Sequence, residues 1–287
     1  MAASTLSKTL ISVAALRDLL QQETSLAIVD CRFSLVDATV GKTQYLASHI
    51  PGAVYAHLNE DLSSEVILGT TGRHPLPDRQ QFVSTVQQLG IHNKQLVVAY
   101  DADNGAYAAR LWWLLRWLGH GQVVVLDGGF AAWQAVDLPV SADLTQQQSK
   151  EEASRFQASD SLVKTVAAAD LLHTKYRITD ARNADRFRGE VEPIDPIAGH
   201  IPAAICLPFS QNMDPAGTFK SADELKSQFL SAGLDENAPT ICYCGSGVTA
   251  CHNVIALVHA GFPEPVLYPG SWSEWITDAN RPIATGE

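Results

Sequence analysis

Short sequence motifs recur in the same order in the two halves of this 287-residue chain. An Asp-x-Arg motif ends an apolar run at Asp30 and again at Asp180. A His-Ile-Pro motif follows at His49 and at His200. Corresponding residues lie between 141 and 151 positions apart along the whole chain. A constant order with one local change of length indicates a duplicated unit, which restricts the fold strongly.

The change of length lies between the His-Ile-Pro motif and the next repeated position. The first half has 52 residues from His49 to Asp101, whereas the second has 44 from His200 to Cys244. The longer first half carries the Pro- and Gly-rich segment 72–77, GRHPLP, in this interval.

Short β-rich runs alternate with helical patterns in both halves. In 108–118, for example, leucines recur at i, i+3, i+4 and i+7, which is typical of an amphipathic helix. This alternation predicts an α/β fold with two tandem domains, each a mainly parallel sheet flanked by helices. We expect the domains at 1–145 and 161–287, with the polar stretch 146–160 as a linker. A single large α/β domain would not explain the repeated motifs.

The overall charge argues against broad classes of partner. With 31 acidic and 20 basic residues the net charge is −11, so we expect binding neither to nucleic acid nor to a membrane. The chain has no apolar run of transmembrane length and no signal-peptide pattern at its N-terminus. Its five cysteines, three of them within 242–251, are not spread like a disulfide framework. We therefore expect a cytoplasmic protein.

A cysteine stands where the second half passes from a strand into a helix. Cys244 follows the apolar run 240–243, precedes a Gly-Ser-Gly turn, and is followed by a helical pattern over 248–260. Glycines in such a turn let successive backbone N–H groups point into one concavity at the helix N-terminus. The anion that the sequence supplies there is the Cys244 thiolate.

The strength of hydrogen bonds predicts how many loop donors this thiolate needs. Lowering a thiol pKa from about 8.5 to about 6.5 requires about 2.7 kcal/mol. A helix dipole contributes about 0.3 to 1 kcal/mol, whereas each hydrogen bond to a charged group contributes about 1.5 to 3 kcal/mol. We therefore expect two or three N–H donors around Cys244.

Three other interpretations of this cysteine cluster stay open. A free cysteine is most often a small buried apolar residue, which suits Cys242 in the strand and Cys251 on the helix. Together with Cys244 and His252 they include the residue types of a zinc site, although no C-x-x-C spacing is present. A cysteine phosphatase or arsenate reductase needs an arginine six positions after the cysteine, and that position is Ala250.

The segment 244–252, CGSGVTACH, closely resembles the active-site loop of the two-domain rhodanese-type sulfurtransferases. The segment 270–275, GSWSEW, is similar to the C-terminal signature of that family, and Asp101 stands where its non-catalytic domain lacks the cysteine. The resemblance runs from about residue 10 to the C-terminus. It implies two tandem rhodanese-like domains, of which the second is catalytic.

The resemblance implies that Cys244 takes sulfur from a small donor, carries it as a persulfide and passes it to cyanide or a thiol, with thioredoxin as one candidate. It implies neither a metal nor an organic cofactor. Covalent storage divides the transfer into two easier steps. A persulfide carrier or sensor without turnover is the alternative. The other loop residues expected to contact the substrate are Gly245, Gly247, Val248 and Thr249.

The charge near the loop bears on the choice of donor. Thiosulfate-preferring relatives carry basic residues just after the cysteine, whereas this loop is uncharged, which favours the monoanion 3-mercaptopyruvate over thiosulfate. Arg186 matches the family's substrate arginine, and a guanidinium can hold a carboxylate with two parallel hydrogen bonds. Some mercaptopyruvate enzymes have a further arginine where this chain has Ile194, and we expect Arg188 to compensate.

The resemblance also implies a group that assists proton transfer. In mercaptopyruvate sulfurtransferases a loop serine, a histidine and an aspartate are thought to act together, and the matching positions here are Ser246, His74 and Asp61. A histidine near its pKa would move a proton during sulfur transfer. A loop histidine without a role in the site is the alternative. Because His49 and His200 occur in both halves, we expect them to be structural.

Overall fold

The computed structural model describes residues 9–22, 24–145 and 155–287. Its internal contacts divide the chain into two compact units, one with the residues up to 62 and 77–162, the other with 63–76 and 163–287. The segment 63–76 therefore belongs to the unit formed by the second half of the sequence. The expected domain ranges assign it to the first domain, and most of the expected linker, 146–154, lies outside the described residues.

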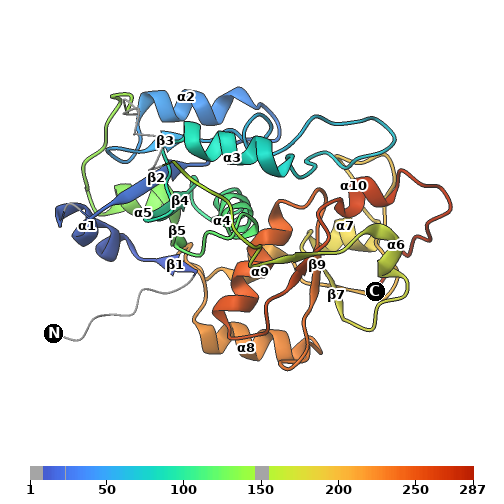
Figure 1. The fold of residues 1–287 in the computed structure, drawn as a ribbon. Helices are drawn as coiled ribbons and strands as arrows, with labels where there is room; N and C mark the ends of the chain where they lie inside the picture. The colour runs from blue at the N-terminus through green and yellow to red at the C-terminus, as the bar shows by residue number, and fades with distance from the viewer. Residues whose placement is uncertain (1–8, 23, 146–154) are drawn as a thin grey trace. The chain divides into compact units, whose positions relative to one another are not determined.

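The first unit contains a five-stranded sheet in the order β1-β5-β4-β2-β3, in which all paired strands are parallel (Figure 1). Its strands are β1 (Leu10–Ile11), β2 (Leu26–Asp30), β3 (Val54–Tyr55), β4 (Leu96–Tyr100) and β5 (Val123–Leu126). Its helices are α1 (Val13–Gln21), α2 (Thr39–Ala47), α3 (Arg79–Gln88), α4 (Ala108–Trp117) and α5 (Gly129–Ala135).

Helices α1 and α5 pack on one face of this sheet. Leu16 of α1 and Trp133 of α5 share a core with Ile28 and Val98, which are paired across β2 and β4 and point to the same face of the sheet. Helix α4 contacts β4 and β5 and is buried along nearly its whole length. The helix predicted over 108–118 is thus confirmed, but it is buried on all sides rather than on one stripe.

The second unit contains a five-stranded parallel sheet in the order β6-β10-β9-β7-β8. Its strands are β6 (Lys164–Thr165), β7 (Ile178–Asp180), β8 (Ala204–Cys206), β9 (Ile241–Tyr243) and β10 (Val266–Leu267). Its helices are α6 (Ala168–Leu171), α7 (Ala184–Arg188), the 3₁₀-helix η2 (Phe209–Asn212), α8 (Ala222–Ser231), α9 (Thr249–His259) and α10 (Ser271–Trp275). In the described part of the chain, no helix is long and apolar enough to cross a membrane.

The two sheets have the same strand order when each is numbered within its own unit, as the predicted duplication requires. The repeated motifs also form the same contacts. The Asp30 carboxylate accepts hydrogen bonds from the backbone and guanidinium of Arg32, and Asp180 does the same with Arg182. Both ion pairs are buried, so they hold the ends of β2 and β7 in place.

The repeated histidines likewise hold the backbone. The Nδ1 atom of His49 lies 2.6 Å from the carbonyl oxygen of Tyr45, and that of His200 lies 2.7 Å from the carbonyl oxygen of Phe187. Each histidine also forms an isolated antiparallel bridge with a residue late in its own unit. These contacts agree with the structural role expected from their repetition.

Candidate active site

The candidate site lies where β9 ends at the carboxyl edge of the second sheet. Cys244 is the next residue and is only 2% exposed. The N–H of Gly247 donates a hydrogen bond to the Cys244 Sγ atom over 3.1 Å. Gly247 has φ +78°, and an added Cβ there would run into the carbonyl of Pro269. The turn around the sulfur therefore requires glycine at this position.

The corresponding loop of the first unit shows what these backbone groups bind. The Asp101 carboxylate accepts hydrogen bonds from the N–H groups of Gly105, Tyr107 and Ala108 over 2.8 to 3.1 Å. Ala108 is the first residue of α4, and Tyr107 is the residue before it. In this fold, the turn from the fourth strand into its helix thus surrounds a buried anion with three N–H donors.

The second unit has donors at the matching positions but no carboxylate. Counted from the start of α9, the residues that correspond to Gly105, Tyr107 and Ala108 are Ser246, Val248 and Thr249. Among the described residues, no protein group accepts a hydrogen bond from the N–H groups of these three residues or of Gly245. Backbone N–H groups that are buried or partly buried nearly always find a partner, so these donors are available to an anion or to water beside Cys244.

This geometry modifies the expectation of two or three donors to the thiolate. One N–H group, that of Gly247, donates to the Cys244 sulfur. The other loop donors are without a protein acceptor, so they are available to a second sulfur or to an anionic group of a ligand.

The start of α10 holds this loop in position. The Cys244 N–H donates to the Ser271 hydroxyl over 3.1 Å. The N–H groups of Trp272 and Ser273 donate to the carbonyl oxygens of Cys244 and Gly245, each over 2.9 Å. The GSWSEW segment therefore fixes the backbone on which the cysteine stands.

The other cysteines of this region are structural. Burial raises the pKa of Cys242 to about 12, and the Cys251 thiol donates to the Gly247 carbonyl oxygen over 3.3 Å. None of the five cysteines, all of which lie in the described part of the chain, forms a disulfide. The described residues contain no group of three His, Cys, Asp or Glu side chains that would hold a metal ion, so the structure gives no support to the zinc interpretation.

The predicted pair of His74 and Ser246 meets within the second unit. The Nδ1 atom of His74 lies 2.7 Å from the Ser246 hydroxyl, and both residues are buried. This contact exists because the segment 63–76 packs with the second unit. Asp61 belongs to the first unit, where it accepts a hydrogen bond from the His57 N–H over 2.7 Å and where burial raises its pKa.

Arg186 lies beside the loop in a network of ion pairs. Its guanidinium donates to both oxygens of Glu192 and to one oxygen of Asp195. Arg73, from the segment 63–76, forms an ion pair with the same Asp195. An ideal Cβ on Gly245 would lie 2.8 Å from the Arg73 Nη2 atom and 3.7 Å from both terminal nitrogens of Arg186. Two guanidinium groups thus occupy the space over the uncharged loop.

Sequence reasoning missed Arg73, Glu192 and Asp195. Arg73 stands next to His74, and both lie in the extra length of the first half. This neighbourhood was the one sequence feature that could have indicated Arg73. Glu192 and Asp195 flank the position where a further arginine was sought. Nothing in the sequence by itself joins Arg73 to Asp195, because 122 residues separate them.

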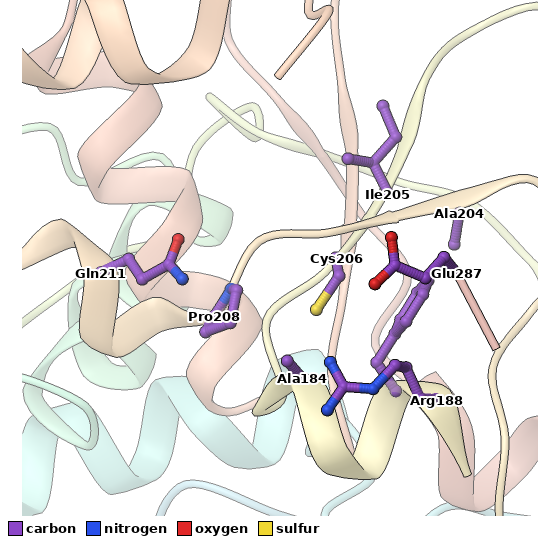
Figure 2. Close-up of a pocket in the computed structure, with 9 residues that line it drawn as sticks. Ala184, Arg188, Ala204, Ile205, Cys206, Pro208, Gln211 and Glu287 are labelled. Atoms are coloured by element: carbon purple, nitrogen blue, oxygen red, sulfur yellow. The ribbon is translucent and has the colours of Figure 1, made fainter. Parts of the chain in front are cut away.

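Arg188 points elsewhere, although it lies only two residues from Arg186. Its guanidinium forms two hydrogen bonds of 2.8 Å with the Glu190 carboxylate. Figure 2 shows it beside the Cys206 sulfur. Both residues line a pocket of about 410 Å³. Residues two apart on a helix do not share a face, so α7 directs these arginines to different sites. The full lining of this pocket is Ala184, Phe187, Arg188, Ala204, Ile205, Cys206, Pro208, Gln211 and Glu287.

Comparisons with known proteins show the family to which the two units belong. The sequence profile of the rhodanese-like domain matches residues 12–136 and 165–278. A Pseudomonas aeruginosa protein named "Probable 3-mercaptopyruvate sulfurtransferase" is 47% identical over 273 residues, which cover 92% of this chain and 94% of that protein. The thiosulfate sulfurtransferase of Gallus gallus is 34% identical, with 88% and 86% covered.

A solved structure is also similar over nearly the whole chain. The crystal structure of SseA from Escherichia coli, described under 3-mercaptopyruvate sulfotransferases and the "Rhodanese" fold, superposes with a TM-score of 0.80 at 32% sequence identity. The match covers 93% of this chain and 100% of that one.

Proposed function

This chain belongs to the rhodanese-like domain family and is a sulfurtransferase, and on that premise we propose that 3-mercaptopyruvate is its sulfur donor and Cys244 its sulfur carrier. The acceptor in this proposal is a thiol, such as that of thioredoxin, or cyanide. No metal or organic cofactor takes part in the proposed steps.

The first step moves one sulfur atom from the donor to the enzyme. The Cys244 thiolate attacks the sulfur of 3-mercaptopyruvate, and an S–S bond forms as the carbon–sulfur bond breaks. The electron pair of the broken bond stays with the carbon, which then takes a proton to give pyruvate. Cys244 is left as a persulfide, and the proton lost from the donor thiol balances the one gained by carbon.

The second step returns the enzyme to its starting state. An acceptor thiolate attacks the outer sulfur of the persulfide, the S–S bond breaks, and Cys244 leaves as the thiolate. The acceptor becomes a persulfide, or thiocyanate when the acceptor is cyanide. Cys244 is a thiolate at the start and at the end of the cycle, and the acceptor takes up the same sulfur atom that the donor gives. The reaction therefore needs no external oxidant or reductant.

The observation that carries this proposal is the unfilled set of N–H donors around Cys244. In the first unit the corresponding turn, which is two residues longer, is occupied by the Asp101 carboxylate. In the second unit a shorter thiol stands in its place, and the N–H groups of Ser246, Val248 and Thr249 have no protein acceptor among the described residues. A persulfide extends the side chain by one anionic sulfur, which these donors would stabilise.

We assign the donor carboxylate to Arg186 rather than to Arg188. Arg186 is held by Glu192 beside Gly245, only 15% of its side chain is exposed, and it is therefore preorganised. The charges over the loop also favour a monoanion: the two guanidinium groups of Arg73 and Arg186 face the two carboxylates of Glu192 and Asp195. Thiosulfate, a dianion, would meet no excess of positive charge there.

The His74–Ser246 pair is assigned to proton movement. The hydroxyl lies on the catalytic loop and the imidazole is 2.7 Å from it, so the pair is suited to pass the thiol proton of the donor toward the carbon that becomes a methyl group. Asp61 belongs to the first unit. Steady-state kinetics of an Asp61 variant would test whether it takes part in the proposed proton movement.

The donor is tested by measuring kcat/KM for 3-mercaptopyruvate and for thiosulfate with one common acceptor. We expect a clear preference for 3-mercaptopyruvate, and loss of turnover in Cys244→Ser. Cys206→Ser is the matched control, because Cys206 lies on β8 outside the loop, and it should retain the activity. A preference for thiosulfate would refute the donor assignment, and activity in Cys244→Ser would refute the carrier. Cys244 persulfidation without turnover would indicate a carrier or sensor instead.

A further inference from the structure

We propose that the pocket beside Cys206 binds a free α-amino acid with an aromatic side chain. Its lining comes from β8, α7, η2 and Glu287, so it is distinct from the loop around Cys244. Its volume of about 410 Å³ lies within the range of small-molecule sites, about 300 to 1,000 Å³. The proposal goes beyond the proposed function and does not depend on the reaction assigned to Cys244.

The register of the two sheets shows which residue of the first unit corresponds to Cys206. In the first unit, Tyr55 of β3 pairs with Asp30 at the end of β2. In the second unit, Cys206 of β8 pairs with Asp180 at the end of β7. Because the two sheets have one strand order, a thiol stands in the second unit where the first unit has a phenol ring.

The Tyr55 ring fills the space between β3 and α2 in the first unit. It stacks on Tyr45 of α2 with the ring centroids 5.5 Å apart, and its hydroxyl donates to the Arg32 carbonyl oxygen over 3.0 Å. An added Cβ on Gly41, which is also in α2, would lie 2.7 Å from that hydroxyl. The much smaller Cys206 side chain leaves the corresponding space open, and we assign the pocket to it.

Phe187 of α7 provides the aromatic wall that Tyr45 provides in the first unit. Phe187 stacks on His200 with the ring centroids 3.7 Å apart. Tyr45 stacks in the same way on His49, with the centroids 4.2 Å apart. Since Phe187 also lines the pocket, a ligand ring in this space can stack on it as Tyr55 stacks on Tyr45.

Two groups of opposite charge, Arg188 and Glu287, also line the pocket. The Arg188 Nε and Nη2 atoms donate to Glu190, and in the described part of the chain the Nη1 atom has no acceptor. The Gly286 N–H donates to the Arg188 carbonyl oxygen over 3.0 Å, which holds Glu287 beside α7. Among the described residues, Glu287 forms no ion pair with Arg188. Figure 2 shows the guanidinium, the Glu287 carboxylate and the Cys206 sulfur around one space.

These two charged groups favour a zwitterionic ligand. A ligand carboxylate can accept hydrogen bonds from the Arg188 Nη1 atom, and a ligand ammonium group can donate to Glu287. An α-amino acid carries both groups on one carbon, and an aromatic side chain supplies the ring that Cys206 lacks. A ligand with only one of the two charges would leave either Arg188 or Glu287 without its partner.

The test uses 4-fluoro-L-phenylalanine as the probe, and fluorine NMR at millimolar probe concentrations gives its dissociation constant. Two analogues each lack one charge: 3-(4-fluorophenyl)propionate has no ammonium group, and 4-fluorophenethylamine has no carboxylate. We expect each analogue to bind at least about tenfold more weakly than the amino acid. Absence of probe binding, or equal binding of either analogue, would overturn the proposal.

Two arginines of α7 distinguish this pocket from the site beside Cys244. Arg188→Met should raise the dissociation constant of the probe about tenfold or more. Arg186→Met is the matched control, because Arg186 lies on the same helix but beside Gly245, and it should leave the constant unchanged. The reverse pattern would place the probe at the loop and overturn the proposal. Binding should also persist in Cys244→Ser, so failure of the proposed function leaves this test valid.

Cys206→Tyr tests whether the pocket is the space of the absent ring. The new side chain should fill that space as Tyr55 does and abolish probe binding, whereas Cys206→Ser keeps the space and should bind like the wild type. Unchanged binding in folded Cys206→Tyr would overturn the proposal.

Protection of the Cys206 thiol gives a readout in the wild-type protein, independent of whether Cys206→Tyr folds. Cys206 is half-buried, whereas the other four cysteines are buried. Burial raises the pKa of Cys206 to about 11, so the thiol is labelled with iodoacetamide at alkaline pH and followed by peptide mapping. Saturating probe should slow this labelling. An unchanged rate with the probe bound would place the probe elsewhere and overturn the proposal.

Discussion

The Ser246 hydroxyl connects the loop after Cys244 to a histidine that lies 172 residues earlier in the sequence. Both side chains are buried, so water cannot readily replace either partner. A neutral imidazole accepts on one nitrogen and donates on the other, which lets the pair shift a proton between the hydroxyl and the ring. In the proposed function, this contact supplies a proton-transfer group beside the nucleophile.

Removing the hydroxyl should slow the chemical step without abolishing donor binding. In Ser246→Ala we expect kcat to fall by about a hundredfold, at the low end of the effect of general acid–base groups, with KM nearly unchanged. His74→Asn should have a similar effect, and the double variant should be no slower than either single one. Steady-state kinetics and single-turnover persulfidation of Cys244 measure these quantities. Additive losses would contradict the view that the two residues act as a unit.

Glu192 ties the stability of the site to pH. Burial acts to raise its pKa, but hydrogen bonds from Arg186 and from two backbone N–H groups outweigh it, so the pKa of Glu192 lies below its usual range. A carboxyl with a lowered pKa stabilises the folded state above the unfolded value of about 4.3, and this contribution is lost as the pH falls through the folded pKa.

Glu192→Gln should therefore flatten the dependence of the unfolding free energy on pH below about pH 4.3. Glu190→Gln is the matched control, because the pKa of Glu190 is also lowered by an arginine, Arg188, but the carboxylate is exposed. Salt screens exposed pairs far more than buried ones. In denaturant titrations at about 1 M salt, only the Glu192 variant should still differ from the wild type; equal curves would contradict this account.

At the scale of elements, corresponding strand-to-helix turns have different contents in the two units. The turn from β4 into α4 encloses a carboxylate of its own, whereas the turn from β9 into α9 leaves its donors open beside a thiol. The second turn also needs a glycine at 247, where φ is +78° and the Pro269 carbonyl leaves no room for a Cβ. The shape of the sulfur site thus depends on a backbone conformation that other residues adopt at a cost.

Gly247→Ala should destabilise the second unit and impair the nucleophile. Gly261→Ala is the matched control, since Gly261 follows α9 with φ +83° but has open space where a Cβ would be added. Left-handed backbone strain alone costs about 1 to 2 kcal/mol, so we expect that loss of unfolding free energy in Gly261→Ala and a larger loss in Gly247→Ala. Only Gly247→Ala should slow iodoacetamide alkylation of Cys244. Equal effects of both variants would show that the Pro269 contact is unimportant.

At the scale of the whole molecule, the unit that carries the candidate site is discontinuous in sequence. The segment 63–76 leaves the first half of the chain and packs with residues 163–287. It contributes Arg73 and His74, and its Gly72 lies against the start of α10. The two units of this duplicated fold therefore differ by the extra length of the first half. That half has Asp101 where the second half has Cys244.

Replacing 63–76 by a flexible Gly/Ser linker of equal length should loosen the second unit selectively. Hydrogen exchange followed by mass spectrometry should show faster exchange in 244–247 and 270–273, because the hydrogen bonds of Arg73 and His74 are lost. Strands β2 and β4 of the first unit should keep their protection. The control replaces only the exposed residues 65–70 and should leave the exchange of both loops unchanged. Faster exchange confined to the first unit would contradict the assignment of this segment.

The sequence by itself determined the features that depend on local pattern. The recurring motifs predicted two similar α/β units, and the structure has two five-stranded parallel sheets with one strand order. The helix predicted over 248–260 is α9, 249–259, and Cys244 lies in the turn before it as expected. The sequence predicts these features because the spacing of apolar residues and the positions of glycines are local properties of the chain.

Only the tertiary structure decided which charged groups meet over that turn. The sequence favoured Arg188 as the second arginine, yet residues two apart on α7 face different ways, and Arg188 pairs with Glu190 beside Cys206. Arg73 takes the place over Gly245 because the segment 63–76 packs with the second unit. The physical reason is that an ion pair across 122 residues depends on how remote segments pack, which no local pattern encodes.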